Sequence, residues 1–161
     1  MTPPPKPRAR RARDQLSLAD YQALGAFRLA LRKFAAFSDA SAHEEGLTSQ
    51  HHQALLAVRA HSGPEPMTIG ELAECLMIKN HSAVELVGRL VAAGLITRSP
   101  SEEDRRRIVL RLTPEAEARL EAISRRNLRE LSSSAPVLRD LLKTVRRIGK
   151  QKGEATGEKD P

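Results

Sequence analysis

The sequence predicts a mainly α-helical protein that carries one small β-hairpin. Apolar residues recur at spacings of three and four along most of the chain, as on the buried face of a helix. Residues 107–112 instead alternate with the two-residue period of a strand. The 161 residues include no Trp, one Tyr and three Phe, so aliphatic side chains must form the core.

The first predicted helix is long. It begins at Ser17, where Asp20 completes a capping pattern, and extends to about Ala42. Its apolar face consists of Leu24, Phe27, Leu31 and Phe34. At 1.5 Å per residue such a helix is roughly 40 Å long. A long apolar helix near the end of a small chain often packs against a second subunit.

A shorter second helix is predicted to begin after Thr48. Its core face consists of Leu55, Leu56 and Val58. Ser, Gly and Pro residues within residues 62–66 end it.

Two short helices separated by a tight turn follow. A Thr-x-x-Glu capping box, Thr68 with Glu71, opens the third helix. The turn covers residues 77–79 and the fourth helix residues 80–92. Gly94 ends the fourth helix, because glycine readily takes the left-handed backbone conformation.

Residues 95–98 and 107–112 are predicted to be two strands joined by a charged tip. In the second strand Ile108, Leu110 and Leu112 alternate with Val109 and Arg111. Two short helices, a tight turn and a two-stranded hairpin together make a winged helix-turn-helix.

Two further helices are predicted after the hairpin. Thr113 caps the first of them, with Pro114 at its first position. Its apolar side consists of Leu120, Ile123, Leu128 and Leu131. Residues 132–136 interrupt the chain, and the last helix carries Leu138, Leu141, Leu142, Val145 and Ile148.

The charge balance favours a polyanionic partner, since the formal net charge is +7. Residues 1–13 hold five basic residues, four prolines and no acid. This arm is interpreted either as a solvated tail or as a non-specific contact to phosphate. It has no apolar stretch like that of a secretory signal, and no run in the chain is long enough to span a membrane.

Several other classes of site find little support. The single cysteine, Cys75, excludes a disulfide within the chain and a Cys-rich zinc site, and it fits a reducing cytoplasm. Its position beside Leu72 and Leu76 indicates a small apolar residue rather than a redox sensor. No phosphate-binding Gly-rich loop, Gly-x-Ser-x-Gly or His-x-x-x-His motif is present, so no enzyme is predicted.

A cluster of possible metal ligands lies near the junction of the first two helices. It consists of His43, Glu44, Glu45, His51 and His52. The spacing fits no compact metal motif, and the adjacent histidines point about 100° apart on a helix. We therefore expect neither a metal nor another cofactor.

Residues 68–98 read TIGELAECLMIKNHSAVELVGRLVAAGLITR. The hairpin then carries the pattern Asp-x-Arg, five residues, Leu-Thr, formed by Asp104, Arg106, Leu112 and Thr113. In both parts the chain resembles the MarR family of bacterial transcription regulators, over roughly residues 18–148. The resemblance implies a homodimer whose first helix and last two helices interleave with those of its partner.

The resemblance also implies that the fourth helix enters a major groove of DNA and the wing an adjacent minor groove. The helix packs inward through Ala83, Leu86, Val87 and Leu90. Its other face carries the predicted DNA-binding residues Asn80, His81, Ser82, Glu85 and Arg89. Asn can pair with adenine and Glu can accept from cytosine. Many family members have Arg or Thr where this chain has Glu85 and Val84.

In the wing, Arg106 is the predicted minor-groove residue, because a guanidinium suits the enhanced negative potential there. Asp104 is expected to hold an arginine by a charge-assisted hydrogen bond. Arg105 and Arg107 are candidate phosphate contacts. The alternative is a solvated charged hairpin with no partner.

Five segments are therefore predicted: a disordered basic arm (1–15), a dimerisation helix (16–47), a DNA-binding lobe (48–113), C-terminal dimerisation helices (114–148) and a disordered tail (149–161). The predicted function is that of a cytoplasmic, sequence-specific regulator on a pseudo-palindromic operator in double-stranded DNA. The resemblance implies a repressor relieved by a small-molecule effector. The alternatives are a dimeric protein-interaction module and a non-specific nucleic-acid binder.

Overall fold

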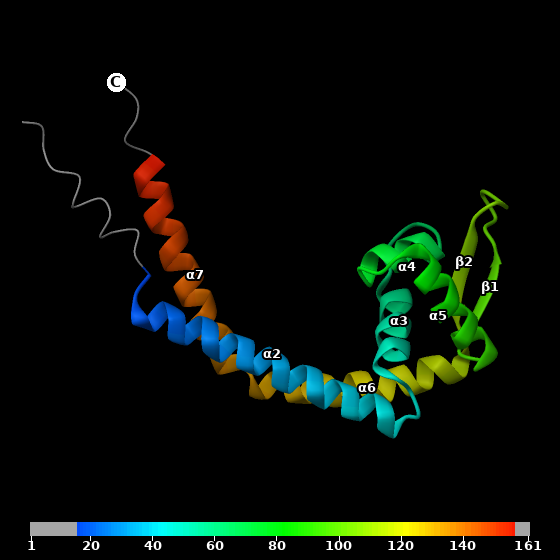
Figure 1. Cartoon of the computed structure of the whole chain (residues 1–161), viewed down its shortest axis with the longest axis horizontal. Coiled ribbons are helices and arrows are strands. Elements are labelled where there is room, and N and C mark those ends of the chain that lie inside the picture. Colours follow the sequence, from blue (N-terminus) through cyan, green and yellow to red (C-terminus); the bar gives the residue numbers. More distant parts are fainter. Residues whose placement is uncertain (1–15, 157–161) are drawn as a thin grey trace, which may run out of the picture. The chain divides into compact units, whose positions relative to one another are not determined.

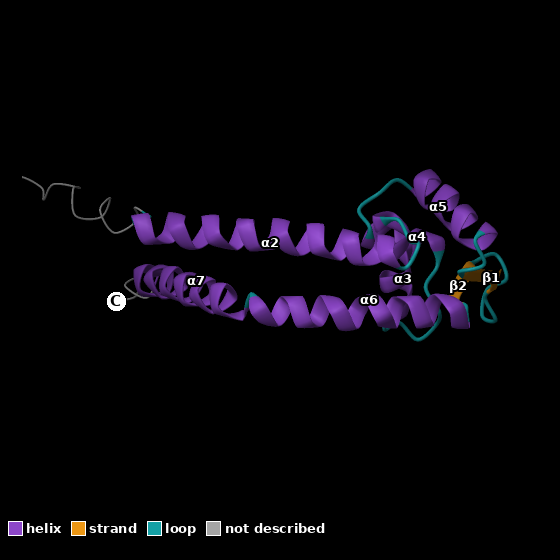
Figure 2. Ribbon diagram, turned by 90° about the horizontal axis from the view of Figure 1, so that it is seen from below, coloured by secondary structure: helices purple, strands orange, loops and turns teal. Residues whose placement is uncertain are grey.

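The computed structural model describes residues 16–156, with side chains described for residues 16–147. Its elements are α2 (Leu18–Glu44), α3 (Ser49–Ala60), α4 (Ile69–Cys75), α5 (Asn80–Ala92), β1 (Ile96–Pro100), β2 (Ile108–Leu112), α6 (Pro114–Ser133) and α7 (Ala135–Thr156) (Figure 1). The predicted fold class, mainly α with one hairpin, is confirmed (Figure 2). The predicted basic arm at 1–15 lies outside the described residues.

The last helix is longer than the sequence predicted. Residue 149 was expected to begin a disordered tail, but α7 continues to Thr156. The expectation was wrong because residues 150–155 include Lys, Gln, Glu and Ala, which favour a helix. Their helix propensity offsets the cost of Gly149 and Gly153. Residues 157–161 lie outside the described part of the chain.

The chain divides into two compact units. One is Ala35–Glu130, and the other combines the described residues up to Phe34 with those from Leu131 onward. The boundaries fall inside α2 and α6, whereas the predicted ones, at 47/48 and 113/114, followed helix ends. The larger unit takes in parts of both helices because Ala42 from α2 and Leu120 from α6 belong to its core.

The core of the larger unit lies among α3, α4, α5 and the hairpin. The predicted inward face of α5 is confirmed, since Leu86, Val87 and Leu90 are at most 2% exposed. Burying each such side chain contributes about 1.5–3 kcal/mol. On α3 the prediction was partly wrong: Leu56 is 44% exposed, while Ala54 is buried. A small residue on the packed face lets neighbouring elements approach closely.

The predicted helix caps are confirmed. At α4 the backbone N–H of Thr68 donates to Glu71 (2.7 Å), and the N–H of Glu71 donates to the Thr68 hydroxyl (3.3 Å). At α2 the N–H of Ser17 donates to Asp20 (2.7 Å). The hydroxyl of Thr113 accepts from the N–H of Ala116 (3.2 Å), as expected for the cap of α6. These bonds satisfy donors that a helix start otherwise leaves unpaired.

The hairpin pairs β1 with β2 antiparallel, from Ile96↔Leu112 to Pro100↔Ile108. The simple alternation predicted for β2 does not hold, because Ile108 is 36% exposed whereas Val109 and Leu110 are both buried. Besides β1, β2 contacts α3 and α4, and a bridge joins its Val109 to Thr68 on the other edge. The middle of β2 is thus enclosed on both edges.

In the smaller unit, α2 and α7 are joined by an ion pair between the buried Asp20 and Arg147. Large apolar side chains are nevertheless exposed on both helices: Leu24 at 51%, Leu31 at 49%, Leu142 at 55% and Val145 at 55%. These residues belong to the predicted apolar faces, which the described chain alone does not cover. No helix among the described residues is long and apolar enough to cross a membrane.

The turn between α4 and α5 contains a residue in an unfavourable backbone conformation. Met77 has φ = 54° and is 92% exposed. The turn closes through hydrogen bonds from Met77 N–H to Glu74 O and from Ile78 N–H to Ala73 O, both 3.0 Å. This arrangement ends many helices and normally places glycine at the left-handed position.

Replacing Met77 by glycine should therefore stabilise the protein, by up to about 1 kcal/mol, because the steric strain of a left-handed side chain exceeds the entropy cost of glycine. The free energy of unfolding in urea measures this effect. Met77→Ala is the matched control, since it removes the exposed side chain and keeps the strain. A Met77→Gly protein no more stable than Met77→Ala would contradict the interpretation.

Polar groups are buried where α2, α3 and α6 meet. His52 is 4% exposed and its Nε2 has no hydrogen-bond partner among the described residues. Asn127, 8% exposed, donates to the hydroxyl of Ser38 (2.9 Å). Burial lowers the pKa of His52 below its ordinary value, and the charge of Asp39 opposes this shift in part. The folded protein thus favours the neutral imidazole.

A pH dependence of stability follows. The pKa of His52 is lower in the folded state than in the unfolded chain, so the unfolded chain binds more protons as the pH falls below about 6.5. The free energy of unfolding should therefore decrease as the pH is lowered through this range. His52→Gln should flatten the decline between about pH 7.5 and 5.5 in denaturant titrations. His81→Gln, at an exposed position, is the control. An equal decline in His52→Gln and the unaltered protein would refute this assignment.

Candidate nucleic-acid interface

Helix α5 presents a polar face to solvent. Of the predicted binding residues on it, Asn80, His81, Glu85 and Arg89 are exposed and Ser82 is half-buried. The buried face of the same helix fixes their direction. The structure therefore brings these five residues to one accessible surface, with Asn80, His81 and Ser82 in the first turn and Arg89 in the last.

The start of α5 is open to an anionic group. Its N-cap residue is Lys79, and no side chain accepts a cap hydrogen bond there. The N–H groups of the first helical turn have no acceptor within the helix and carry a partial positive charge. This helix end can receive a phosphate without displacing a side chain.

The tip of the hairpin has an ordered backbone. Asp104 was expected to hold an arginine by a charge-assisted hydrogen bond. Its Oδ1 accepts from the backbone N–H of Arg106 (3.0 Å), so this arginine is held through its backbone, and the carbonyl of Asp104 accepts from the N–H of Arg107 (2.9 Å). A short acidic side chain bonds readily to the backbone two residues ahead, as in many turns.

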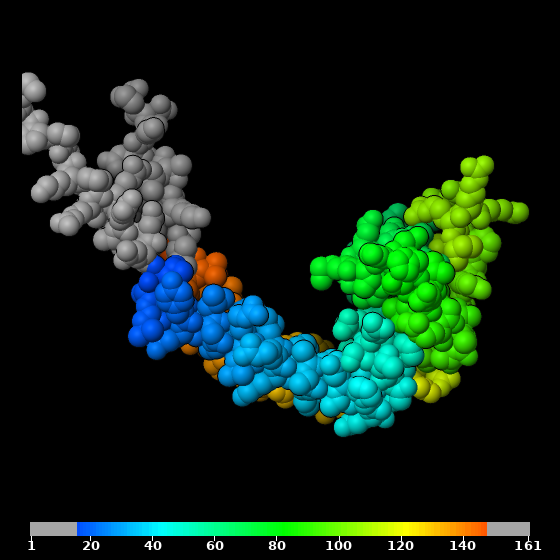
Figure 3. Space-filling model, in the orientation of Figure 1, coloured from blue at the N-terminus to red at the C-terminus, as the bar shows by residue number. Residues whose placement is uncertain are grey.

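Consequently the guanidinium groups of Arg105 and Arg106 make no hydrogen bond or ion pair with other described residues, and both side chains are exposed. Figure 3 shows the tip that carries them standing clear of the body of its unit. The backbone is held while the cationic groups stay available, which suits contact with an external anion.

Arg107 differs from its neighbours. Its Nη2 lies 3.6 Å from Glu71 Oε1, so it links the wing to the first turn of α4. Hydrogen bonds from the hydroxyl and then the N–H of Thr68 lower the pKa of Glu71, with smaller effects in the same direction from His61 and Arg107. The carboxylate is thus kept ionised and able to hold the arginine.

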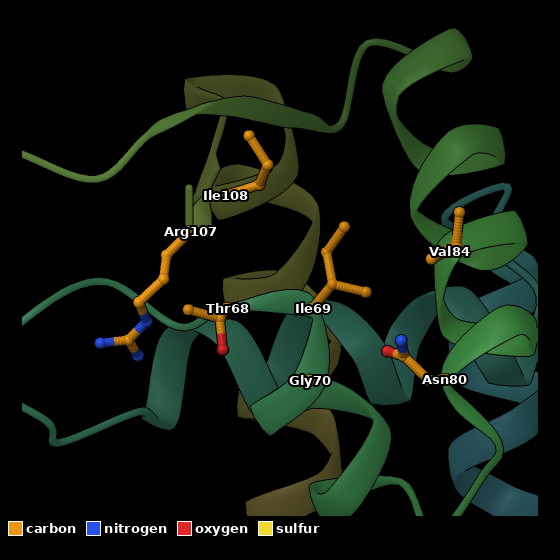
Figure 4. Close-up of a pocket in the computed structure, with 7 residues that line it drawn as sticks. All are labelled: Thr68, Ile69, Gly70, Asn80, Val84, Arg107 and Ile108. Atoms are coloured by element: carbon orange, nitrogen blue, oxygen red, sulfur yellow. The ribbon is translucent and has the colours of Figure 1, made fainter. Parts of the chain in front are cut away.

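A pocket of about 310 Å³ lies between the starts of α4 and α5 and the adjoining end of β2. It is lined by Thr68, Ile69, Gly70, Asn80, Val84, Arg107 and Ile108 (Figure 4). Val84 is 47% exposed, although it is apolar and lies on the predicted polar face of α5. The sequence interpretation left Val84 out of the site. An apolar residue off the core face was the signal that could have identified it.

Other predicted features have different positions. Cys75 is exposed, so its interpretation as a packed apolar residue was wrong. It lies at the end of a short helix whose packing depends on Leu72 and Ala73. Both carboxylates of the histidine-rich cluster, Glu44 and Glu45, pair with Arg126. Among the described residues, no group of three or more His, Cys, Asp or Glu side chains could hold a metal ion.

Known proteins share this architecture. Residues 45–107 match the model of the MarR family. A MarR-family transcription regulator of known structure is 25% identical, with a TM-score of 0.64 over 86% of this chain and 93% of its own. No curated protein matches the sequence.

Two more distant structures share the fold. A mutant of Escherichia coli MarR, solved with operator DNA, is 21% identical, with a TM-score of 0.57 over 74% of this chain and 89% of its own. Bordetella bronchiseptica BpsR, whose DNA binding is regulated by 6-hydroxynicotinic acid, is 19% identical, with a TM-score of 0.56 over 76% of this chain and 89% of its own. Residues 45–107 therefore resemble the MarR family, and the winged-helix fold around them is similar to that of a MarR-family transcription regulator.

Proposed function

We propose that this protein is a cytoplasmic, dimeric regulator that binds specific sequences in double-stranded DNA. One observation carries the proposal: the polar face of α5 and the free arginines of the wing tip belong to one compact unit and are both exposed. A helix of this kind fits the major groove, and a hairpin beside it reaches the adjacent minor groove.

Sequence would be read mainly at the start of α5. Asn80 can form two hydrogen bonds with adenine, and Ser82 can contact a base or a phosphate. Glu85 can accept from the amino group of cytosine. The half-exposed Val84 adds an apolar surface that suits the methyl group of thymine. These four residues cover different base preferences and give the helix a basis for discrimination.

The wing would supply affinity and a preference for shape. Arg106 would enter the minor groove, where narrow A·T-rich sequences have an enhanced negative potential. Arg105 would contact phosphate beside it. Asp104 would remain with the backbone that it orders, at a distance from the DNA.

Dimerisation is supported by the exposed apolar faces of α2 and α7. Leucines that are about half exposed recur along both helices, and monomeric proteins rarely expose a contiguous apolar surface of this kind. A second copy of the chain would cover these faces in a two-fold symmetric contact. The two α5 helices of the dimer would then bind two half-sites about 10 base pairs apart, centre to centre.

A repressor relieved by a small molecule is the form of regulation we propose. The dimer would cover a promoter, and a ligand would favour a spacing of the two lobes that no longer fits the operator. The regulation of BpsR by 6-hydroxynicotinic acid supports the choice of a small effector. The chemical identity of an effector for this chain does not follow from its residues.

The second candidate is a protein-interaction module with weak affinity for DNA. The exposed carboxylate of Glu85 favours it, because a negative charge in the groove is repelled by phosphates. Selection of bound duplexes from a random-sequence pool separates the candidates.

At about 150 mM salt, where non-specific binding is weakened, we expect enrichment of a palindrome with half-sites about one helical turn apart. Sequencing of the retained duplexes gives the result directly. Retention without enrichment would indicate a general binder. No retention would favour the protein-interaction module.

A further inference from the structure

The segment 65–71, which comprises the approach to α4 and its first turn, contacts the wing at successive points. The carbonyl of Met67 accepts from the N–H of Leu110 (2.8 Å), and Thr68 bridges to Val109. Glu71, further along, pairs with Arg107. The segment therefore joins the wing to the helix-turn-helix.

Beyond these contacts, one residue of the tip is buried. Ser101 is 3% exposed, whereas residues 102–107 are all exposed. Its hydroxyl donates to Glu65 Oε2 (2.7 Å) and accepts from the N–H groups of Glu103 (3.1 Å) and Asp104 (3.2 Å). Its own N–H donates to the carbonyl of Arg107 (2.8 Å), which closes the loop.

We propose that Glu65, acting through Ser101, is a positioning residue for the DNA contacts of the wing. This inference rests on the proposed DNA-binding function. The carboxylate of Glu65 fixes the Ser101 hydroxyl, the hydroxyl orients the next turn of backbone, and that turn sets the direction of Arg105 and Arg106.

The energetic reason is preorganisation. A free loop of charged residues loses conformational entropy when it enters a groove, and this loss weakens binding. A hydrogen bond to a charged carboxylate is stronger than one between neutral groups. Because Ser101 is buried, water competes little for its hydroxyl. The wing thus meets DNA with much of its ordering already complete.

For the removal of Glu65, a positioning role and simple electrostatics predict changes in DNA affinity of opposite sign. Glu65 carries a negative charge, so its removal alone should strengthen attraction to a polyanion. If Glu65 positions the wing, its removal should instead weaken binding. The direction of the change therefore distinguishes positioning from charge.

Four variants test it. Glu65→Ala and Ser101→Ala both remove the hydrogen bond, the second without changing the charge. Glu65→Gln removes the charge but keeps an oxygen that can accept from Ser101. Glu102→Ala is the matched control, since it removes a carboxylate from the same exposed tip and its side chain makes no hydrogen bond or ion pair to the described residues.

The first readout is affinity for the duplex enriched from the random pool. We expect Glu65→Ala and Ser101→Ala each to weaken binding roughly tenfold, with unfolding temperatures close to that of the unaltered protein. Glu65→Gln should restore most of the affinity, and Glu102→Ala should bind at least as tightly as the unaltered protein. A Glu65→Ala protein that binds as Glu102→Ala does would overturn the proposal.

The second readout needs no DNA. Amide hydrogen exchange should speed up at residues 103, 104 and 107 in Glu65→Ala and Ser101→Ala, and stay unchanged in Glu102→Ala. Unchanged exchange in the first two variants would overturn the positioning role even if affinity fell. If exchange changes as expected but no duplex is enriched for the unaltered protein, then the proposed function fails while the contact itself is upheld.

Discussion

The contact of segment 65–71 with the wing is the one on which the arrangement of the larger unit depends. A two-stranded hairpin is only marginally stable alone. Here Met67 and Thr68 enclose its second edge, and the capping box at Thr68 begins α4 at the same place. The wing and the helix-turn-helix therefore share one short segment, and a change in that segment affects both.

This contact accounts for features that have no explanation within the wing itself. Val109 is buried although the strand pattern assigned it to the outer face, and it is the residue of β2 that bridges to Thr68. The carboxylate of Glu71 serves as a helix cap and as a partner of Arg107. Meanwhile Arg105 and Arg106 remain free of such partners among the described residues. Within one hairpin, Arg107 is thus paired with a carboxylate of the same unit, whereas Arg105 and Arg106 are available to an external anion.

Much of this fold could be predicted from the sequence, because its signals are local. The Thr68–Glu71 capping box, the inward face of α5 and the glycine after it depend on residues a few positions apart. The contacts that hold the wing join residues far apart in the chain, and periodicity carries no information about them. Ser101 and Glu65 are an example: each reads as an ordinary polar loop residue, and only the fold brings them within 2.7 Å.

The candidate site shows the same division. The exposed face of α5 followed from helical geometry once the apolar face was known. The sequence predicted that Asp104 holds an arginine but not through which atoms, because a carboxylate beside three arginines has both side-chain and backbone donors within reach. Backbone donors two residues away were favoured, since a short side chain loses little freedom in reaching them.

The central claim is that α5 and the wing read DNA together and that the basic residues near the N-terminus are not the source of specific binding. The most direct measurement compares three proteins on the enriched duplex and on a scrambled duplex: the unaltered chain, Arg106→Ala, and a chain lacking residues 1–13. The account predicts that Arg106→Ala loses roughly tenfold or more in affinity for the enriched duplex alone, and that truncation weakens binding to both duplexes equally. Loss of all binding on truncation, with Arg106→Ala unaffected, would contradict it.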